Sequence, residues 1–471
     1  MNSKKSGIFS LLFCVLMLFG SIPSGANSAQ TRWQGVTSTG TIVTEQDCPI
    51  VVEKEQLTFE INEFPQTYYS DTESFLSYSG KVTADYTFYN PSDLSVSATL
   101  VFPFGTAPDY MNIYDSENGG CIYGADTAKY RITVNEKEIQ PIIRHTWTSG
   151  SFSLERDLPR IHDTYVNDPF FTPDLTVTKY TYKISGISNE YSAATAAFCR
   201  GKDDLKTKIL LQNQSGMNAS DSYIQLHLWA ENEQEVNVYF FGEAPSHDIG
   251  WRIYENGACE REIGGSVSFV SSETIDFKAF ALQSYNSSLG ISETDWYNAM
   301  VEDLKQSEKN SYGILSCSDK NFDISSRLMR WYQYDIALEP KEKITNTVTA
   351  PIYPSINRDY DPPVYGYQYL LSPAKTWADF GELEIVINTP YFITESNTDG
   401  FAKSENGYKL TLDGLPDGEL EFTLSSSENP SKPFNIYFPI EIIIVCAVFA
   451  VLLTGGIVVF VLLRKRKKKS R

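Results

Sequence analysis

Apolar and polar residues alternate with a period of two over many short segments between residues 50 and 424. This period is typical of β-strands that have one buried face and one solvated face. The clearest examples are residues 82–88 and 94–102, in which every second residue is apolar and which are separated by a turn at residues 90–92. The two segments together predict a β-hairpin.

Further strands are expected where the same alternation recurs, at residues 50–61, 130–134, 175–184, 208–211, 223–230, 236–241, 267–270, 275–282, 328–338, 344–352, 383–387, 408–412 and 420–424. Turns rich in Gly, Pro, Asn and Asp separate these segments. Many short strands with such turns favour antiparallel β-sandwich domains over alternating strand and helix units. The predicted fold class is therefore mainly β.

One short helix is predicted between two strand-rich blocks. Ser292 can cap its first turn, and Asp295 completes a capping box with it. Trp296, Met300 and Leu304 follow at a spacing of four residues and form an apolar stripe. Such a stripe is expected to dock on a sheet.

This helix marks a predicted domain boundary near residue 288. We expect a β-sandwich region at residues 30–288 and a second β-rich domain, which begins with the helix, at residues 289–424. The polar stretch at residues 425–436 begins with the sequence SSSENPSKP, which covers residues 425–433. We interpret the stretch as a stalk.

A long uncharged segment near the carboxyl end predicts a membrane helix. The 22 residues from Ile442 to Leu463 carry no charge. At about 1.5 Å per residue they reach roughly 33 Å, slightly more than a hydrocarbon core. With its flanking aromatic residues, the predicted single transmembrane helix spans residues 437–463.

A basic tail at residues 464–471, which begins with Arg464 and Lys465, follows the predicted membrane helix. Basic residues stay on the cytoplasmic side of a membrane, so residues 30–436 are expected outside the cell. A small-residue stripe, Cys446, Ala450 and Thr454, is compatible with helix-mediated self-association, but chance also produces such stripes.

The first 29 residues have the layout of a secretory signal peptide. Lys4 and Lys5 precede an apolar run at residues 8–19, and small polar residues follow. The alternative, an uncleaved anchor, is disfavoured because the run is too short to cross a bilayer. The expected protein is a single-pass type I protein of the cell membrane, and its sparse cysteines and short signal favour a bacterial source.

The predicted exterior, residues 30–434, holds 30 basic and 58 acidic residues, a net charge of −28. Such a surface repels nucleic acid, whose binding depends on clusters of Lys and Arg. Its five cysteines include no C-x-x-C pair, so ordinary hydrophobic cores rather than disulfides are expected to hold it together.

A D-x-S-x-S motif at Asp93, Ser95 and Ser97 resembles only in its letters the magnesium sites of adhesive domains. Alternate residues on a strand are about 6.6 Å apart, so Asp93 and Ser97 would be separated by about 13 Å and could not share one ion. We expect the solvated face of a strand here. No metal or cofactor site is predicted elsewhere, because H-E-x-x-H and C-x-x-C motifs are missing from the sequence.

A tyrosine-rich segment is the candidate partner-binding surface. Tyr353, Tyr360, Tyr365 and Tyr367 lie within YPSINRDYDPPVYGYQY, and tyrosine offers rigid, amphipathic contact area. The alternative is that Tyr365, Tyr367 and Tyr369 form one face of a strand packed into a sheet.

These observations favour an ectodomain that acts as a binding or structural module for a protein or glycan partner at the cell surface. The sequence lacks the G-x-S-x-G elbow, and no other catalytic motif identifies an enzyme. The alternative function is a membrane-tethered hydrolase that uses a carboxylate pair, which the sequence does not single out.

Overall fold

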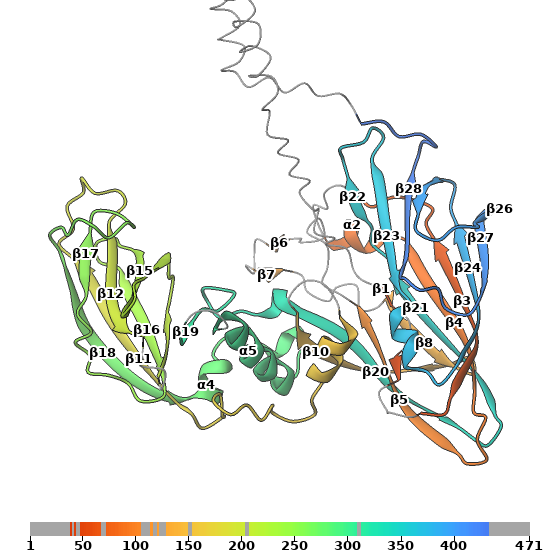
Figure 1. Cartoon of the computed structure of the whole chain (residues 1–471), viewed down its shortest axis with the longest axis horizontal. Coiled ribbons are helices and arrows are strands. Elements are labelled where there is room, and N and C mark those ends of the chain that lie inside the picture. The colour runs from red at the N-terminus through yellow and green to blue at the C-terminus, as the bar shows by residue number, and fades with distance from the viewer. Residues whose placement is uncertain are drawn as a thin grey trace, which may run out of the picture.

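The computed structural model describes residues 48–66, 72–104, 129–148, 153–202, 207–308 and 312–432, together with four two-residue strands. These strands are β1 (Ser38–Thr39), β2 (Ile42–Val43), β6 (Tyr114–Asp115) and β7 (Gly120–Cys121). The prediction of a mainly β fold is confirmed. Figure 1 shows two strand-rich bodies with a layer of helices between them.

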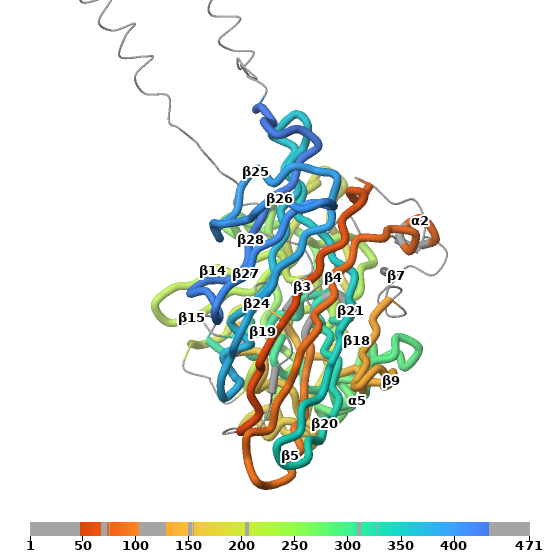
Figure 2. The backbone as a smooth tube through the Cα atoms, turned by 90° about the vertical axis from the view of Figure 1, so that its right-hand side faces the viewer, coloured from red at the N-terminus to blue at the C-terminus, as the bar shows by residue number. Residues whose placement is uncertain are grey.

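The first body, which we call sandwich 1, contains an eight-stranded and a nine-stranded sheet. The eight-stranded sheet has the order β26 (Ala402–Ser404), β27 (Gly407–Asp413), β24 (Phe380–Asn388), β3 (Val51–Glu60), β4 (Lys81–Tyr89), β21 (Lys343–Pro351), β8 (Arg131–Val134) and β9 (Lys137–Ile139). Figure 2 shows β24, β3, β4 and β21 side by side.

The nine-stranded sheet covers the inner face of the first. Its order is β10 (Ile142–Trp147), β20 (Leu328–Leu338), β5 (Val96–Phe104), β1, β23 (Val364–Leu370), β28 (Leu420–Ser425) and β25 (Phe392–Ser396), with β2 beside β5 and β22 (Ser355–Asn357) beside β23. Most pairs are antiparallel as predicted, but β3 pairs in parallel with β24 and β1 with β23.

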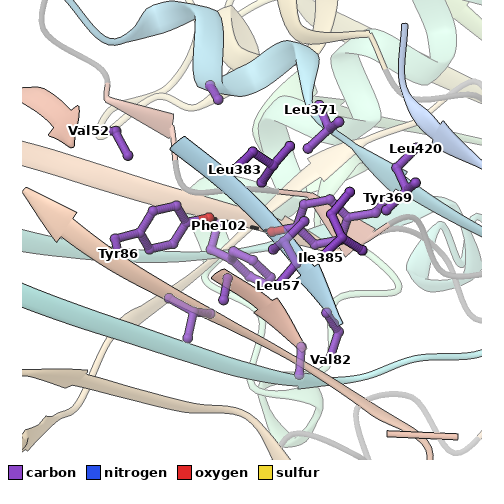
Figure 3. Packing of buried hydrophobic residues seen from close by; sticks show 14 of the residues in the cluster. Val52, Leu57, Val82, Tyr86, Phe102, Tyr369, Leu371, Leu383, Ile385 and Leu420 are labelled. Carbon is purple, nitrogen blue, oxygen red and sulfur yellow. Dashed lines mark hydrogen bonds between the residues drawn. The ribbon is translucent and has the colours of Figure 1, made fainter. Parts of the chain in front are cut away.

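The alternating residues of both sheets form one core between them. Phe59 of β3 is fully buried and meets the rings of Tyr369 and Phe422 edge to face, at centroid distances of 6.0 and 5.2 Å. Figure 3 shows side chains from the two sheets, among them Leu57 and Leu420, packed in this space. Aromatic pairs in this geometry stabilise a core beyond the area that they bury.

The predicted hairpin of residues 82–88 and 94–102 is wrong. β4 pairs with β3 and β21, whereas β5 pairs with β20, so the turn between β4 and β5 connects the two sheets across the core. Asn90 fixes this connection: it is fully buried, and its amide donates to the backbone oxygens of Leu94, Leu338 and Glu339 at 2.7, 3.3 and 3.0 Å. Alternation reveals an inward face but not the sheet to which it belongs.

The second body, sandwich 2, consists of a five-stranded and a four-stranded sheet. The five-stranded sheet has the order β18 (Ser266–Asp276), β11 (Thr176–Ser185), β16 (Glu235–Phe241), β13 (Lys208–Leu211) and β19 (Ile314–Leu315). The other has the order β14 (Gly216–Ala219), β15 (Tyr223–Trp229), β12 (Thr195–Gly201) and β17 (Arg252–Tyr254). Residues such as Ile224 and Val238 fill the core between them.

The predicted helix is α5 (Glu293–Glu308), which lies between β10 and α4 (Phe277–Ala281). Asp295 donates its backbone N–H to Ser292 Oγ at 3.0 Å, as the capping box predicts. Trp296, Met300 and Leu304 are fully buried. The described residues also form two short α-helices, α2 (Thr72–Ser77) and α3 (Leu154–Asp157). They include 3-10 turns at Leu158–Arg160, Ser287–Leu289, Ser325–Arg327 and Ser372–Thr376.

Buried charges join α5 to sandwich 1. Asp295 is 3% exposed, and its carboxylate accepts from the Arg144 guanidinium at 3.3 Å and from the backbone N–H of His145 at 2.8 Å. Arg144 also donates to the exposed Asp163 at 2.7 Å. The aspartate that the sequence assigns to helix capping therefore also neutralises a buried arginine.

The chain leaves sandwich 1 after β10, forms sandwich 2 and the helices, and returns through β20, which pairs with β10. Strands on both sides of residue 288 thus share the sheets of sandwich 1; the predicted division into domains at this residue stays a prediction. Within the described ranges, no helix has the length and apolarity needed to cross a bilayer. The predicted signal peptide and the segment from Ile442 to Leu463 lie outside those ranges.

Candidate functional site

A polar groove lies on the outer face of the nine-stranded sheet, where β22, β23, β28 and β25 meet. Its volume is about 360 Å³. Its polar lining consists of Ser355, Gln368, Glu395, Ser396, Asn397, Glu421 and Thr423. The groove exists because side chains alternate along β23: the tyrosines at 367 and 369 point into the core, whereas Gly366 and Gln368 lie on the other face.

Gly366 keeps the floor of the groove open. A Cβ atom at this position would lie 2.7 Å from Ser355 Oγ and 3.9 Å from Thr423 Cγ2. The first distance is shorter than van der Waals contact, so a side chain here would displace the Ser355 hydroxyl and fill part of the groove. Glycine in a strand often marks such a close approach of another group.

Hydrogen bonds hold the polar side chains in place before any ligand arrives. Gln368 Nε2 donates to Glu421 Oε1 at 2.7 Å. The Asn397 side chain accepts from the backbone N–H of Glu421 at 2.9 Å and donates to the backbone oxygen of Glu419 at 2.6 Å. These contacts fix the β25 side of the groove against β28, which lowers the entropy that binding would cost.

The groove is acidic. Glu395 and Glu421 are both exposed, and the described residues that line the groove include neither lysine nor arginine. Ionised carboxylates only accept hydrogen bonds, whereas the amides and hydroxyls beside them both donate and accept. This combination suits a ligand rich in hydroxyl or amino groups and disfavours an anion.

The structure distributes the four candidate tyrosines between core and surface. Tyr353 and Tyr367 are 1% and 2% exposed. Tyr365 is half-buried and stacks on Phe64 at a centroid distance of 3.7 Å, and burial raises the pKa of its phenol. Tyr360 is also half-buried, with the Lys432 ammonium 4.8 Å from its ring centroid. A partner contact through Tyr360 and Tyr365 stays a prediction.

The groove residues were not predicted from the sequence, because the tyrosines of the same strand offer the more obvious contact surface. The signal was nevertheless present: in VYGYQYL, Gly366 and Gln368 alternate with the tyrosines and must occupy the opposite face. The partners on β25 and β28 come from residues 395–397 and 421–423. Their position beside β23 depends on long-range strand pairing, which the sequence pattern does not encode.

The other residues singled out in the sequence are occupied by local contacts. Asp93 forms an ion pair with Lys341 at 3.0 Å, and Ser95 donates to Glu339 at 2.6 Å. Across the described ranges, no three His, Cys, Asp or Glu side chains gather closely enough to hold a metal ion.

One carboxyl group has the raised pKa that a general acid requires, but it lies in the core of sandwich 1. Glu55 of β3 is fully buried, and burial raises the pKa of its carboxyl to about 7, against the opposing effect of hydrogen bonds from Tyr86 and Tyr369. Tyr369 donates to Glu55 Oε1 at 3.4 Å. Figure 3 shows the phenol oxygens of Tyr86 and Tyr369 directed toward each other. A substrate cannot reach this group in the folded protein.

Comparisons with known proteins identify no family. No family model matches the chain, and no curated protein matches it. One similar solved structure is that of a proposed nutrient-binding protein from Legionella pneumophila, with 10% sequence identity and a TM-score of 0.33. The match covers 83% of this chain and 71% of that one. At this level of likeness, it supports no inference about function.

Proposed function

We propose that the chain is a single-pass type I membrane protein whose ectodomain binds a glycan at the cell surface through the groove on the nine-stranded sheet. The observation that carries the proposal is the composition of the groove: two exposed carboxylates, amides and hydroxyls around a glycine floor. Sugars present many hydroxyl groups, each of which can donate to a carboxylate or amide oxygen.

The acidic lining selects among glycans. Sulfated or phosphorylated sugars would bring negative charge beside Glu395 and Glu421, and like charges at short range are repelled. The two carboxylates do not repel neutral sugars, and they attract the positively charged amino group of an amino sugar. The expected ligand is therefore a neutral or amino-bearing glycan.

Membrane anchoring is the second part of the proposal. It is supported by the uncharged segment from Ile442 to Leu463 and by the cations that begin with Arg464 and Lys465. We expect the full chain to stay in the membrane fraction during alkaline carbonate extraction, and a chain that ends at residue 432 to be released. Protease added to intact cells should digest the ectodomain; complete protection from the protease would contradict this topology.

A glycan panel tests the binding proposal. The purified full chain should retain neutral and amino glycans and leave sulfated ones unbound. The double variant Glu395→Gln/Glu421→Gln should lose this discrimination, because it removes both charges and keeps the side-chain shapes.

A matched control removes two charges elsewhere on the surface, in Glu190→Gln/Glu231→Gln, where both side chains are exposed. This variant should bind as the wild type does. Retention of sulfated glycans alone, or equal behaviour of the two double variants, would refute the role of the groove. Release of sugar products during the assay would favour the hydrolase alternative.

A further inference from the structure

β18 is an unusual edge strand. It runs for 11 residues, Ser266–Asp276, and within the described chain it pairs only with β11. The other terminal strands of the four large sheets have two to six residues, and the longest of them, β10, packs against α5. Edge strands are commonly kept short or covered because their free N–H and C=O groups invite pairing with another strand. β18 is long, and most of its residues are exposed.

The side chains of β18 also leave it open to pairing. The strand contains no lysine, arginine or proline, the residues that commonly block an edge. Two apolar side chains near its centre, Phe269 and Val270, are 38% and 51% exposed. Val270 is the extra residue of a bulge, because Phe269 and Ser271 face successive residues of β11. The bulge leaves Val270 without an opposite residue on β11 and bends the strand locally.

We propose that β18 pairs with β18 of a second copy of this chain, antiparallel about a two-fold axis near Phe269. The two five-stranded sheets then continue into one another across the dimer. Figure 1 places β18 along the outer edge of sandwich 2, and its carboxyl end leads into α4.

The distribution of charge along β18 favours β18 of a second copy as the partner strand and favours antiparallel pairing. Residues 266–272 carry no charge, whereas Glu273 and Asp276 lie together at the end of the strand. Antiparallel pairing about Phe269 places the acidic ends of the two strands far apart and the apolar residues at the centre. Parallel pairing would place like charges directly opposite each other, which is destabilising. An edge that complements itself is what an isologous two-fold interface requires.

The dimer should become stronger as salt is added. The chain has a net charge of −20, so two copies repel each other over a distance that salt shortens. Backbone hydrogen bonds and apolar contacts at the interface are little affected by salt. An interface made of ion pairs would respond in the opposite direction.

Photocross-linking of the purified full chain tests the proposal. With p-benzoylphenylalanine in place of Phe269, irradiation should yield a product of twice the chain mass of 53.0 kDa, in increasing amount as salt is raised. The same probe in place of Tyr223, an aromatic residue on β15 that is 46% exposed, serves as the control and should yield the monomer.

A second variant tests the strand edge itself. Val270→Lys, in the chain that carries the probe at 269, adds a charge to an exposed side chain and should abolish the doubled product, whereas Leu94→Lys, at a position that is 75% exposed in sandwich 1, should leave it unchanged. The proposal would be overturned if the probe at position 269 yields only monomer, or if the probes at 269 and 223 yield equal amounts of the doubled product. Equal effects of the two lysine variants on the doubled product would also overturn it. Glycan binding by the groove would stand in all of these cases, because the two sites lie in different sandwiches.

Discussion

Replacement of Glu55 by glutamine should change how the stability of sandwich 1 depends on pH. An ordinary glutamate has a pKa of 4.5, and burial raises that of Glu55 to about 7. The Glu55 carboxyl therefore stays protonated in the folded protein over a pH range in which it is ionised in the unfolded chain. The stability that the neutral group supports is fully present below pH 4.5 and is lost as the pH rises toward 7.

The magnitude follows from the size of the shift. A pKa difference of about 2.5 units, at 1.36 kcal/mol per unit, amounts to about 3 kcal/mol. Glutamine keeps the shape of the side chain but does not ionise. Relative to Glu55→Gln, the free energy of unfolding of the wild type should fall by about 3 kcal/mol between pH 4.5 and pH 8, and remain constant at higher pH.

Urea unfolding of both proteins at several pH values measures this difference. Glu384→Gln provides a control of opposite sign: burial raises the pKa of Glu384, but hydrogen bonds from Lys409 and Lys54 outweigh it and lower the pKa. The stability that Glu384 contributes should therefore disappear as the pH falls. The reasoning would be refuted if the difference in the free energy of unfolding between the wild type and Glu55→Gln stays constant from pH 4.5 to pH 8.

Three further substitutions test the packing. Asp295→Ala should lower the free energy of unfolding by about 3–5 kcal/mol, because it removes the buried partner of the buried Arg144. Asp163→Ala removes an exposed partner of the same arginine and should lower it by less than about 1 kcal/mol. Asn90→Ala should cost at least about 1–3 kcal/mol, since it leaves buried backbone oxygens without a donor. Phe59→Ala should cost about 3–5 kcal/mol and Leu94→Ala less than about 0.5 kcal/mol. Urea unfolding measures each change. Equal effects of Asp295→Ala and Asp163→Ala, equal effects of Phe59→Ala and Leu94→Ala, or an unchanged stability of Asn90→Ala would contradict the burial described here.

Local patterns predicted most of the elements, because burial on one face of a strand or helix leaves a period in the sequence. The strand expected at residues 275–282 is wrong: β18 ends at Asp276, and Phe277–Ala281 forms the helix α4. The stripe Trp296, Met300 and Leu304 is fully buried, and the alternation at residues 82–88 does form one strand with an inward face. Both features depend only on residues a few positions apart.

Pairing between distant segments was not predictable in the same way. β4 and β5 have the pattern of a hairpin, yet they belong to different sheets, because a strand that faces a core reads the same whichever sheet it joins. The groove needs Gln368 beside Glu421, a contact set by the pairing of β23 with β28. From the sequence alone, these residues have no common pattern.

The measurement that tests the central claim most directly is the affinity of the Gly366→Ala chain for the neutral or amino glycan that the wild type binds most tightly. The added methyl group would crowd Ser355 Oγ in the groove, and we expect binding at least about tenfold weaker, a loss of about 1.4 kcal/mol. Gly201→Ala is the matched control, since a Cβ atom there meets nothing within 4 Å. Equal affinities for wild type and Gly366→Ala would contradict the assignment of the groove as the binding site.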